Sequence, residues 1–219
     1  MAELAVYDVF EERLAAADER PACVLVTTGS LNPIHEGHVS QLVLAATHLE
    51  RLGRQVLAAW LSPSDAEWSM GKQYGCISND DKVQLSRAAV EGHPLVRLHD
   101  WELSQGRIDY PAVISHLKQQ MVERSRGKAV EVLYVCGTDH AQKCHLFIRP
   151  FAVVIGRPGY TRLNSGCKAI YIDHEDDDSD ISSTVIRKAI QEGEVAKVEH
   201  MLHPRVYAIL QERGKSIFL

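Results

Sequence analysis

Short apolar runs alternate along this chain with segments of helical periodicity, and this alternation constrains the fold more than any other feature of the sequence. Six runs are as short as strands and almost continuously apolar, which is typical of strands covered on both faces. They span residues 23–27, 56–61, 96–98, 132–136, 151–155 and 169–172. Because strands and helices alternate, the connections should be right-handed crossovers that keep the strands parallel. The pattern predicts an α/β fold with one doubly wound parallel sheet and helices on both faces.

Segments with an apolar stripe at helical spacing occupy the gaps between these runs and the end of the chain. We expect helices over residues 39–52, 80–90, 111–124, 183–192, 195–202 and 206–213. Residues 1–21 should form an N-terminal helical extension. Residues 22–219 should form a single Rossmann-like domain, because no linker or internal repeat divides them. In sheets of this kind ligands bind beyond the carboxyl ends of the strands.

The composition favours a small-molecule partner. The 219 residues carry a formal net charge of -5, so no global basic field would attract nucleic acid. Five cysteines are scattered without a C-x-x-C pair, which argues against a disulfide framework and a cysteine-rich zinc site. No apolar stretch is long enough to cross a bilayer, and the acidic, amphipathic N-terminus is unlike a secretory signal. We expect a soluble intracellular protein, cytoplasmic with the nucleus not excluded, without a nucleic-acid or membrane partner.

The segment "TTGSLNPIHEGH" follows the first predicted strand and leads into a helix. Gly29 allows a tight turn and a close backbone approach to a ligand, and Ser30 offers a hydroxyl and an N–H group. His35 and His38 are three residues apart at the helix entry, so their rings should share one face. Exposed helix N–H groups and the positive end of the helix dipole favour an anion there. Because imidazoles also donate into this space, the segment predicts a phosphate site.

Two other interpretations of the histidine pair are weaker. Two polar loop histidines without a role would not explain why a turn glycine, a hydroxyl and a helix start accompany them. A zinc site is disfavoured because the helical zinc motif needs two histidines four residues apart with a glutamate between them. No third zinc ligand is evident in the sequence.

A second candidate phosphate site lies near the C-terminus, in "SDISSTVIRKAIQEG". Ser182 or Ser183 should cap the helix, and Thr184 lies in its first turn. Arg187 follows Ser183 by four residues and Thr184 by three, so their side chains should share a face at the helix start. Hydroxyls, helix N–H groups and a guanidinium would together hold a polyphosphate. Taken alone, the segment is also compatible with a capped surface helix whose arginine is solvated.

Several segments resemble one enzyme family. "HEGH" resembles the H-x-G-H signature of the nucleotidyltransferase α/β-phosphodiesterase superfamily, whose members transfer AMP or CMP from a nucleoside triphosphate. "ISSTVIR" closely resembles the I-S-S-T-x-I-R signature of nicotinamide/nicotinate mononucleotide adenylyltransferases, and "GSLNPIHEGH" is similar to their G-S/T-F-x-P-I-x-x-x-H segment. "LSPSDAEW", "LHDWELSQG", "LYVCGTDH" and "VVIGRPGYT" resemble further segments of that family. The resemblance keeps the family's order from about residue 22 to the C-terminus.

The resemblance implies that AMP is transferred from ATP to nicotinamide mononucleotide, nicotinate mononucleotide or both, giving NAD or its acid analogue and pyrophosphate. The implied catalytic residues are His38, His35 and Arg187. The implied ATP-binding residues are Gly29, Ser30, His35, His38, Gly137, Asp139, Ser183, Thr184 and Arg187. The implied mononucleotide-binding residues are Ser30, Leu31, Lys72, Trp101, Asp139 and Arg157. Trp101 would stack on the pyridine ring, because an aromatic face attracts a flat cation.

The same resemblance bears on cofactors and partners. It implies Mg²⁺ bound mainly through the ATP phosphates, with no metal site built from protein ligands. The substrates would be ATP and a pyridine mononucleotide, and a homo-oligomer is compatible with the sequence. Lys72, in the glycine-flanked loop "MGKQYG", would meet the mononucleotide phosphate, or it is a solvated lysine.

One departure concerns the second face of the pyridine ring. Many eukaryotic members of the family have a second tryptophan in a longer loop after C-G-x-D. The corresponding segment here, "HAQKCHLF", is short and lacks tryptophan. Phe147, His145 or no residue would complete the sandwich, so the preference between the amide and the acid mononucleotide is open.

Two alternative functions remain. The first is an adenylyl- or cytidylyltransferase for another acceptor, either pantetheine phosphate or a small alcohol phosphate. "ISSTVIR" and "DWE" argue against it. The second is a nucleotide-binding homologue without turnover. The intact histidine pair and Arg187 argue against that hypothesis.

Overall fold

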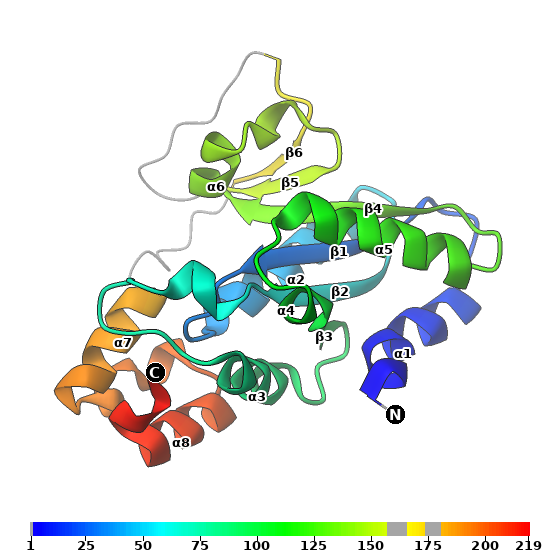
Figure 1. The fold of residues 1–219 in the computed structure, drawn as a ribbon. Helices are drawn as coiled ribbons and strands as arrows, with labels where there is room; N and C mark the ends of the chain where they lie inside the picture. The colour runs from blue at the N-terminus through cyan, green and yellow to red at the C-terminus, as the bar shows by residue number, and fades with distance from the viewer. Residues whose placement is uncertain (1, 157–165, 174–180) are drawn as a thin grey trace.

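The computed structural model describes residues 2–156, 166–173 and 181–219. Within them one sheet contains β1 (Ala22–Gly29), β2 (Gln55–Pro63), β3 (Val96–Leu98), β4 (Val130–Gly137), β5 (Ala152–Ile155) and β6 (Ile170–Ile172). Neighbouring strands are parallel, and their order across the sheet is β3-β2-β1-β4-β5-β6 (Figure 1). The predicted Rossmann-like, doubly wound α/β sheet is therefore confirmed.

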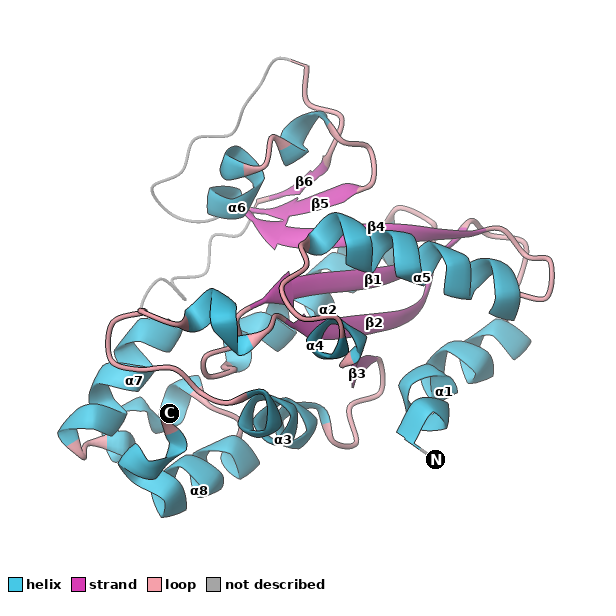
Figure 2. Cartoon of the chain, in the orientation of Figure 1, coloured by secondary structure: helices cyan, strands magenta, loops and turns pink. Residues whose placement is uncertain are grey.

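Helices lie on both sides of the sheet (Figure 2). In the described part of the chain the α-helices are α1 (Ala2–Ala15), α2 (Glu36–Arg51), α3 (Asn79–Val90), α4 (Trp101–Ser104), α5 (Tyr110–Arg124), α6 (Thr138–Lys143), α7 (Ser183–Glu192) and α8 (Pro204–Arg213). The described 3₁₀ helices are η1 (Ala66–Ser69), η2 (Leu146–Ile148), η4 (Val195–Met201) and η5 (Gly214–Ile217). None of these helices is long and apolar enough to span a bilayer.

The predicted helices differ from the observed ones in three ways. The helix expected over residues 195–202 is the 3₁₀ helix η4, because its N–H groups bond three residues back, as from Leu202 to the carbonyl of Glu199. The short helices α4, α6, η1, η2 and η5 are not predicted, since a single turn shows no helical period. α2 begins three residues earlier than expected because His35 is its N-cap.

Side chains along the central strand alternate between two buried layers. Cys23 and Leu25 belong to a core cluster that they share with residues of α2, α3, α7 and α8. Ala22, Val24 and Val26 belong to a second cluster, with residues of α1, α5 and α6. Because both faces of β1 are covered, its sequence is apolar at successive positions instead of alternating.

The strand order reverses between β1 and β4, which are neighbours although β2 and β3 lie between them in the sequence. In open α/β sheets this reversal opens a crevice outside the carboxyl ends of the strands, where ligands bind. β1 ends at Gly29 and β4 ends at Gly137, so both glycines lie at the carboxyl edge of the sheet. The fold therefore places two of the predicted ATP-binding residues beside the switch point.

The N-terminal helix closes one face of the sheet over β2. Phe10 is fully buried, and its ring centroid lies 6.4 Å from that of Trp60. The indole N–H of Trp60 donates to the Val6 carbonyl at 2.9 Å, and Arg13 donates to the Val56 carbonyl at 3.1 Å. α1 is therefore attached to the domain by apolar packing and by hydrogen bonds.

We expect Phe10→Ala to destabilise the protein by about 3–5 kcal/mol, because it removes a buried aromatic ring and leaves a cavity over β2. Urea unfolding followed by circular dichroism measures this change. Val122→Ala is the matched control, since Val122 is 80% exposed. Equal effects of the two substitutions would show that α1 does not contribute to the stability of the fold.

Candidate active site

The start of α2 holds the two histidines together. His35 is the N-cap residue, and its backbone N–H donates to His38 Nδ1 at 3.1 Å. The two ring centroids lie 3.8 Å apart, with 33° between the ring planes. Because Nδ1 accepts this bond, the proton of neutral His38 belongs on Nε2, which becomes a hydrogen-bond donor. The rings share one face of the helix start, as their spacing predicts.

The start of α7 lies against the same loop. Ser182 is the N-cap, since its hydroxyl accepts the N–H of Val185 at 3.2 Å. The hydroxyl of Ser183 instead donates to the Pro33 carbonyl, at 2.9 Å. A Cβ added to Gly37 would lie 3.9 Å from Ile181, so the two helix starts approach closely. Two helix N-termini, each with the partial positive charge of a helix dipole, therefore meet beside the end of β1.

Arg187 ties α7 to two loops. It is 3% exposed, and burial lowers the pKa of its guanidinium. Nη1 donates to the Asn32 carbonyl at 2.7 Å, and Nε donates to the Gln73 carbonyl at 2.9 Å. Nη2 donates to the Thr184 hydroxyl at 3.1 Å. The guanidinium thus adds a positive charge next to the predicted phosphate site. Its bonds to two carbonyls also fix the backbone of the loops around that site.

Lys72 is a second cation at the loop after β1. Its ammonium donates to the Ser30 hydroxyl at 2.6 Å. Desolvation lowers the pKa of Lys72, and the positive charge of Arg187 lowers it further. Two cations that destabilise each other's charged form create a region of positive potential, which favours an anion.

Asn32 is a site residue that the sequence analysis does not identify. Its side chain is fully buried, donates to the Gly75 carbonyl at 3.1 Å and accepts the N–H of Ile77 at 2.9 Å. It therefore fastens the loop that carries Lys72 to the loop after β1. A polar residue before proline in a turn is the only signal in the sequence, and turns commonly contain such residues.

The loop that carries Lys72 also depends on the C-terminal segment. Gly75 has a φ of +108°, and a Cβ there would lie 2.8 Å from the Phe218 ring. Ile77 pairs with Phe218 in an antiparallel bridge, and Leu219 N–H donates to the Cys76 carbonyl at 2.9 Å. Glycine is required at position 75 both for its backbone conformation and for the space that Phe218 occupies.

Leu31 and Asp139 both lie at the carboxyl edge of the sheet, Leu31 in the loop after β1 and Asp139 in a helix after β4. Leu31 follows β1 with a φ of +37°, and its side chain is 2% exposed, so its backbone is the part that can face a ligand. Asp139 lies in the first turn of α6, and Gly137 is the N-cap of that helix. Arg157 lies outside the described residues.

The ends of β1 and β4 are bonded across the switch point. The hydroxyl of Tyr134, on β4, lies 2.8 Å from that of Thr28, on β1, and 3.2 Å from His140 Nε2. The ring of Tyr110 stacks on that of Tyr134, with centroids 4.8 Å apart. Burial raises the pKa of Tyr134 and lowers that of His140, so both are neutral near pH 7. No local pattern in the sequence marks this aromatic group, because its members come from separate strands and helices.

Buried charges support the end of β2. Glu102 is 1% exposed, accepts the Ser62 hydroxyl at 2.6 Å, and has its pKa raised by burial. Lys82 is fully buried and donates to the Ser64 carbonyl at 2.8 Å, and burial lowers its pKa to about 8. Ser64 N–H in turn donates to the Gly29 carbonyl at 2.8 Å. These contacts hold the loop after β2 against the turn after β1.

Trp101 is the first residue of α4, beyond the end of β3. Its indole stacks on the ring of His116, with centroids 3.9 Å apart and an angle of 3°. Both rings line a cavity of about 620 Å³ whose other walls come from α1, α3 and the end of β3. No residue of the two predicted phosphate motifs is among the described residues that line it. Phe147, a candidate second stacking residue, is 2% exposed, whereas His145 is exposed.

The described residues contain no group of three or more His, Cys, Asp or Glu side chains that could hold a metal ion. The groups gathered at the end of β1 are mainly cations, hydroxyls and helix N–H groups, which bind phosphate oxygens instead of a bare cation.

The chain is similar to a family of known proteins. Residues 26–189 match the family model described as cytidylyltransferase-like. A probable nicotinate-nucleotide adenylyltransferase of Bacteroides fragilis (strain YCH46) is 28% identical over 203 residues, which cover 88% of this chain and 92% of the relative. A nicotinamide/nicotinic acid mononucleotide adenylyltransferase of Oryza sativa subsp. japonica is 28% identical over 124 residues, covering 55% of this chain and 49% of the relative. The chain thus spans most of the bacterial relative and about half of the plant one.

A solved structure shows the same fold. The nicotinic acid mononucleotide adenylyltransferase of Plasmodium falciparum, complexed with NaAD, has a TM-score of 0.63 to this chain at 15% sequence identity. The alignment covers 90% of this chain and 98% of that one. At this level of identity the likeness concerns the arrangement of strands and helices.

The buried position of Lys82 predicts a pH-dependent stability. Its folded pKa of about 8 lies below the ordinary value of 10.5, so between these values the unfolded chain binds more protons. The cost of burying the charge is therefore present below pH 8 and disappears as the pH rises toward 10.5. Relative to Lys82→Met, the unfolding free energy of the wild type should rise by roughly 2–3 kcal/mol across this interval.

Chemical unfolding of both proteins at several pH values measures this difference. Lys188→Met, on an exposed lysine, is the control and should show no such trend against the wild type. A difference between wild type and Lys82→Met that stays constant from pH 7.5 to 10 would contradict the assignment.

Proposed function

This chain belongs to the cytidylyltransferase-like family, and from that premise we propose that it transfers AMP from ATP to nicotinamide mononucleotide, to nicotinate mononucleotide or to both. The products are NAD or its acid analogue, and pyrophosphate. The proposal rests above all on one observation: two helix N-termini, a histidine pair and a lysine converge on the end of β1 at the switch point of the sheet. The names of the bacterial and plant relatives support the same reaction.

The reaction needs no covalent intermediate on the protein. An oxygen of the acceptor's 5′-phosphate attacks the α-phosphorus of ATP, and the bond from that phosphorus to the oxygen bridging to the β-phosphate breaks. Pyrophosphate leaves with the electron pair of the broken bond. Because the acceptor phosphate is already a nucleophile, catalysis consists of positioning the two substrates and stabilising the charge that develops.

His38 stabilises the reacting phosphate in this proposal. Its Nδ1 accepts the His35 backbone N–H, so Nε2 carries a proton that can be donated to an α-phosphate oxygen. The bond to the backbone also holds the ring in one orientation, so little reorganisation is needed during reaction. His35 lies beside it, with its ring close to that of His38.

The starts of α7 and α6 hold the other parts of ATP in this proposal. The start of α7, with Ser183, Thr184 and the charge of Arg187, holds the β- and γ-phosphates. Gly29, which ends β1, and Ser30, which follows it, let the backbone approach the α-phosphate. The start of α6, with Gly137 and Asp139, holds the nucleoside part of ATP and the acceptor ribose.

The acceptor phosphate lies on the other side of the loop after β1. Lys72 and Ser30 are bonded to each other and offer a cation and a hydroxyl to it. The Leu31 backbone adds an N–H group, and Arg157 belongs to the same predicted set. The resemblance assigns Trp101 to the pyridine ring.

We propose that Mg²⁺ would be bound together with ATP. The cationic and neutral groups of the site suit a metal ion that is held by the phosphates and keeps several waters. When bound, Mg²⁺ neutralises phosphate charge and so eases the approach of the acceptor phosphate. We also propose a cytoplasmic location, since none of the five cysteines, all within the described residues, forms a disulfide.

A pyrophosphate-release assay tests the function directly. ATP is combined with each pyridine mononucleotide, and mass spectrometry identifies the dinucleotide product. CTP in place of ATP, and pantetheine phosphate in place of the mononucleotide, are the controls. Turnover only with the control substrates would contradict the proposal. Binding of NAD without any turnover would instead identify a nucleotide-binding protein.

We expect His38→Ala to lower kcat by about 10²–10³, as when one donor to a developing charge is removed. The KM values for the two substrates should change much less. His48→Ala is a matched control, because His48 lies in the last turn of the same helix. A kcat close to that of the wild type would remove His38 from the mechanism.

Arg187→Lys should raise the KM for ATP by about tenfold, since a lysine keeps the charge but loses the planar set of donors. The KM for the mononucleotide should change less. Steady-state kinetics with each substrate varied in turn measures both values. Arg205→Lys, on an exposed arginine, is the control. A rise confined to the mononucleotide KM would contradict the assignment of α7 to the triphosphate.

A further inference from the structure

Trp101 is one half of a stacked pair of rings. Its indole is parallel to the imidazole of His116, with ring centroids 3.9 Å apart and 3° between the planes. Trp101 begins α4, whereas His116 lies in the second turn of α5, and both side chains are partly buried. An indole has two faces, so when His116 covers one of them, the other is the face on which a substrate ring can stack.

Further rings connect this pair to the N-terminal helix. The ring centroid of His116 lies 5.5 Å from that of His99, which directly follows β3 and is 2% exposed. His99 Nε2 lies 3.2 Å from the hydroxyl of Tyr7, on α1. The guanidinium carbon of Arg124, on α5, lies 4.0 Å from the centroid of the Tyr7 ring. His116 is therefore packed against rings that α1 and α5 hold in place.

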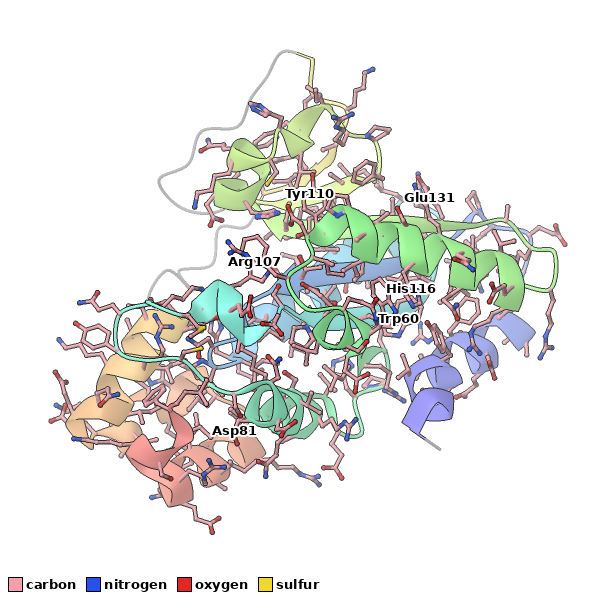
Figure 3. All side chains as sticks on the ribbon, viewed as in Figure 1. Trp60, Asp81, Arg107, Tyr110, His116 and Glu131 are labelled. Atoms are coloured by element: carbon pink, nitrogen blue, oxygen red, sulfur yellow. The ribbon has the colours of Figure 1, made fainter. Side chains whose placement is uncertain are left out.

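The same rings rest on the buried core of the domain. Figure 3 shows His116 on the side of α5 toward Trp60 and α1. Trp60, in β2, is fully buried, and its ring centroid lies 5.5 Å from that of Tyr7 and 6.1 Å from that of His99. A ring packed against a fixed core cannot turn freely. An indole stacked on it therefore loses little conformational freedom when a ligand binds.

The imidazole of His116 is uncharged near pH 7. Desolvation lowers its pKa below the ordinary value of 6.5, and the carboxylate of Glu123, farther along α5, opposes this shift. Burial lowers the pKa of the neighbouring His99 to about 4, so that ring is neutral as well. The other titratable side chains that line the same cavity are Tyr7, Asp80 and Asp100, and Asp100 is paired with Arg87. A neutral ring against one face of the indole leaves its π electrons available to a cation on the other face.

We propose that His116 is a positioning residue for the acceptor mononucleotide: it holds the Trp101 indole in one orientation, and its charge state sets how strongly that indole attracts a cationic ring. This inference rests on the proposed function, in which Trp101 stacks on the pyridine ring. The N-terminal helix contributes to the acceptor site through the same contacts, because Tyr7 and His99 fix the position of His116.

The charge of His116 affects the two mononucleotides differently. Nicotinamide mononucleotide has a cationic ring, whereas the carboxylate of nicotinate mononucleotide offsets that charge. Protonation of His116 places a second cation against the indole, so the two cations compete for one π system. The amide therefore loses more affinity than the acid when the pH falls below the pKa of His116.

Binding and kinetics of five proteins test the proposal: the wild type, His116→Leu, His116→Phe, Trp101→Leu and Gln120→Leu. Titration calorimetry gives the Kd of each mononucleotide, and steady-state assays give kcat and the KM for ATP. We expect His116→Leu to weaken mononucleotide binding by about two- to tenfold, the range for loss of one aromatic pair, with the KM for ATP unchanged. His116→Phe keeps a flat ring and should restore the affinity. Gln120→Leu is the matched control, because Gln120 lines the same cavity from α5.

A second measurement follows the charge of His116. The Kd of the amide is divided by the Kd of the acid at several pH values from 7.5 to 5. In the wild type this ratio should rise by about two- to fivefold as the pH falls, the size of an exposed cation–π contact. In His116→Phe it should stay constant. Both mononucleotides carry the same phosphate, so its titration cancels, and the comparison holds even if His116→Leu does not fold.

The outcomes separate this inference from the function on which it rests. If the wild type turns over the mononucleotide, unchanged affinity in His116→Leu or a ratio that does not vary with pH overturns the inference alone. Unchanged affinity in Trp101→Leu does the same, because the indole then lies outside the acceptor site. If His116→Leu weakens ATP and the mononucleotide equally, His116 only supports the fold, and the inference is overturned. A wild type that neither binds nor uses a pyridine mononucleotide overturns both proposals.

Discussion

One buried guanidinium holds together the parts of the chain from which the candidate site is built. Arg187 belongs to α7, yet it donates to the carbonyls of Asn32 and Gln73 in two separate loops. A guanidinium can serve both carbonyls because its donors point in fixed directions. Without it, two carbonyl groups would lose charge-assisted bonds, and the start of α7 would lose its alignment with the start of α2. The convergence of the helix N-termini is held by this side chain together with the Ser183 hydroxyl, which donates to the Pro33 carbonyl.

The same arrangement concentrates positive charge. Lys72 lies close enough to Arg187 for each charge to disfavour the other, and desolvation adds to that cost. A folded protein that pays such a cost is stabilised by any anion that binds there, because the ligand favours the native state over the unfolded one. Affinity for phosphate and the repulsion between these two cations are therefore two consequences of one arrangement.

The sequence predicts the sheet well because its signals are local. Six apolar runs mark six strands, although the hydrogen-bonded ladders continue past several of them, as from Thr27 to Gly29 in β1. Contacts between distant segments carry no such signal. Asn32 bridges two loops through both ends of its amide, and the partner of Trp101 is a histidine from another helix. The phosphate motifs are contiguous, so their residues are predictable, whereas the aromatic group at Tyr134 is assembled by the fold.

The bridge between Ile77 and Phe218 links the loop that carries Lys72 to the other end of the chain. This loop cannot swing as an independent lid, because its movement would pull on the strand-like pairing and on the ring that fills the space over Gly75. Any closing motion over a bound substrate would therefore be mechanically coupled to η5 and α8. The amide of Leu219, bonded to the Cys76 carbonyl, then becomes a reporter of events at the phosphate site, because its hydrogen exchange follows the opening of that bond.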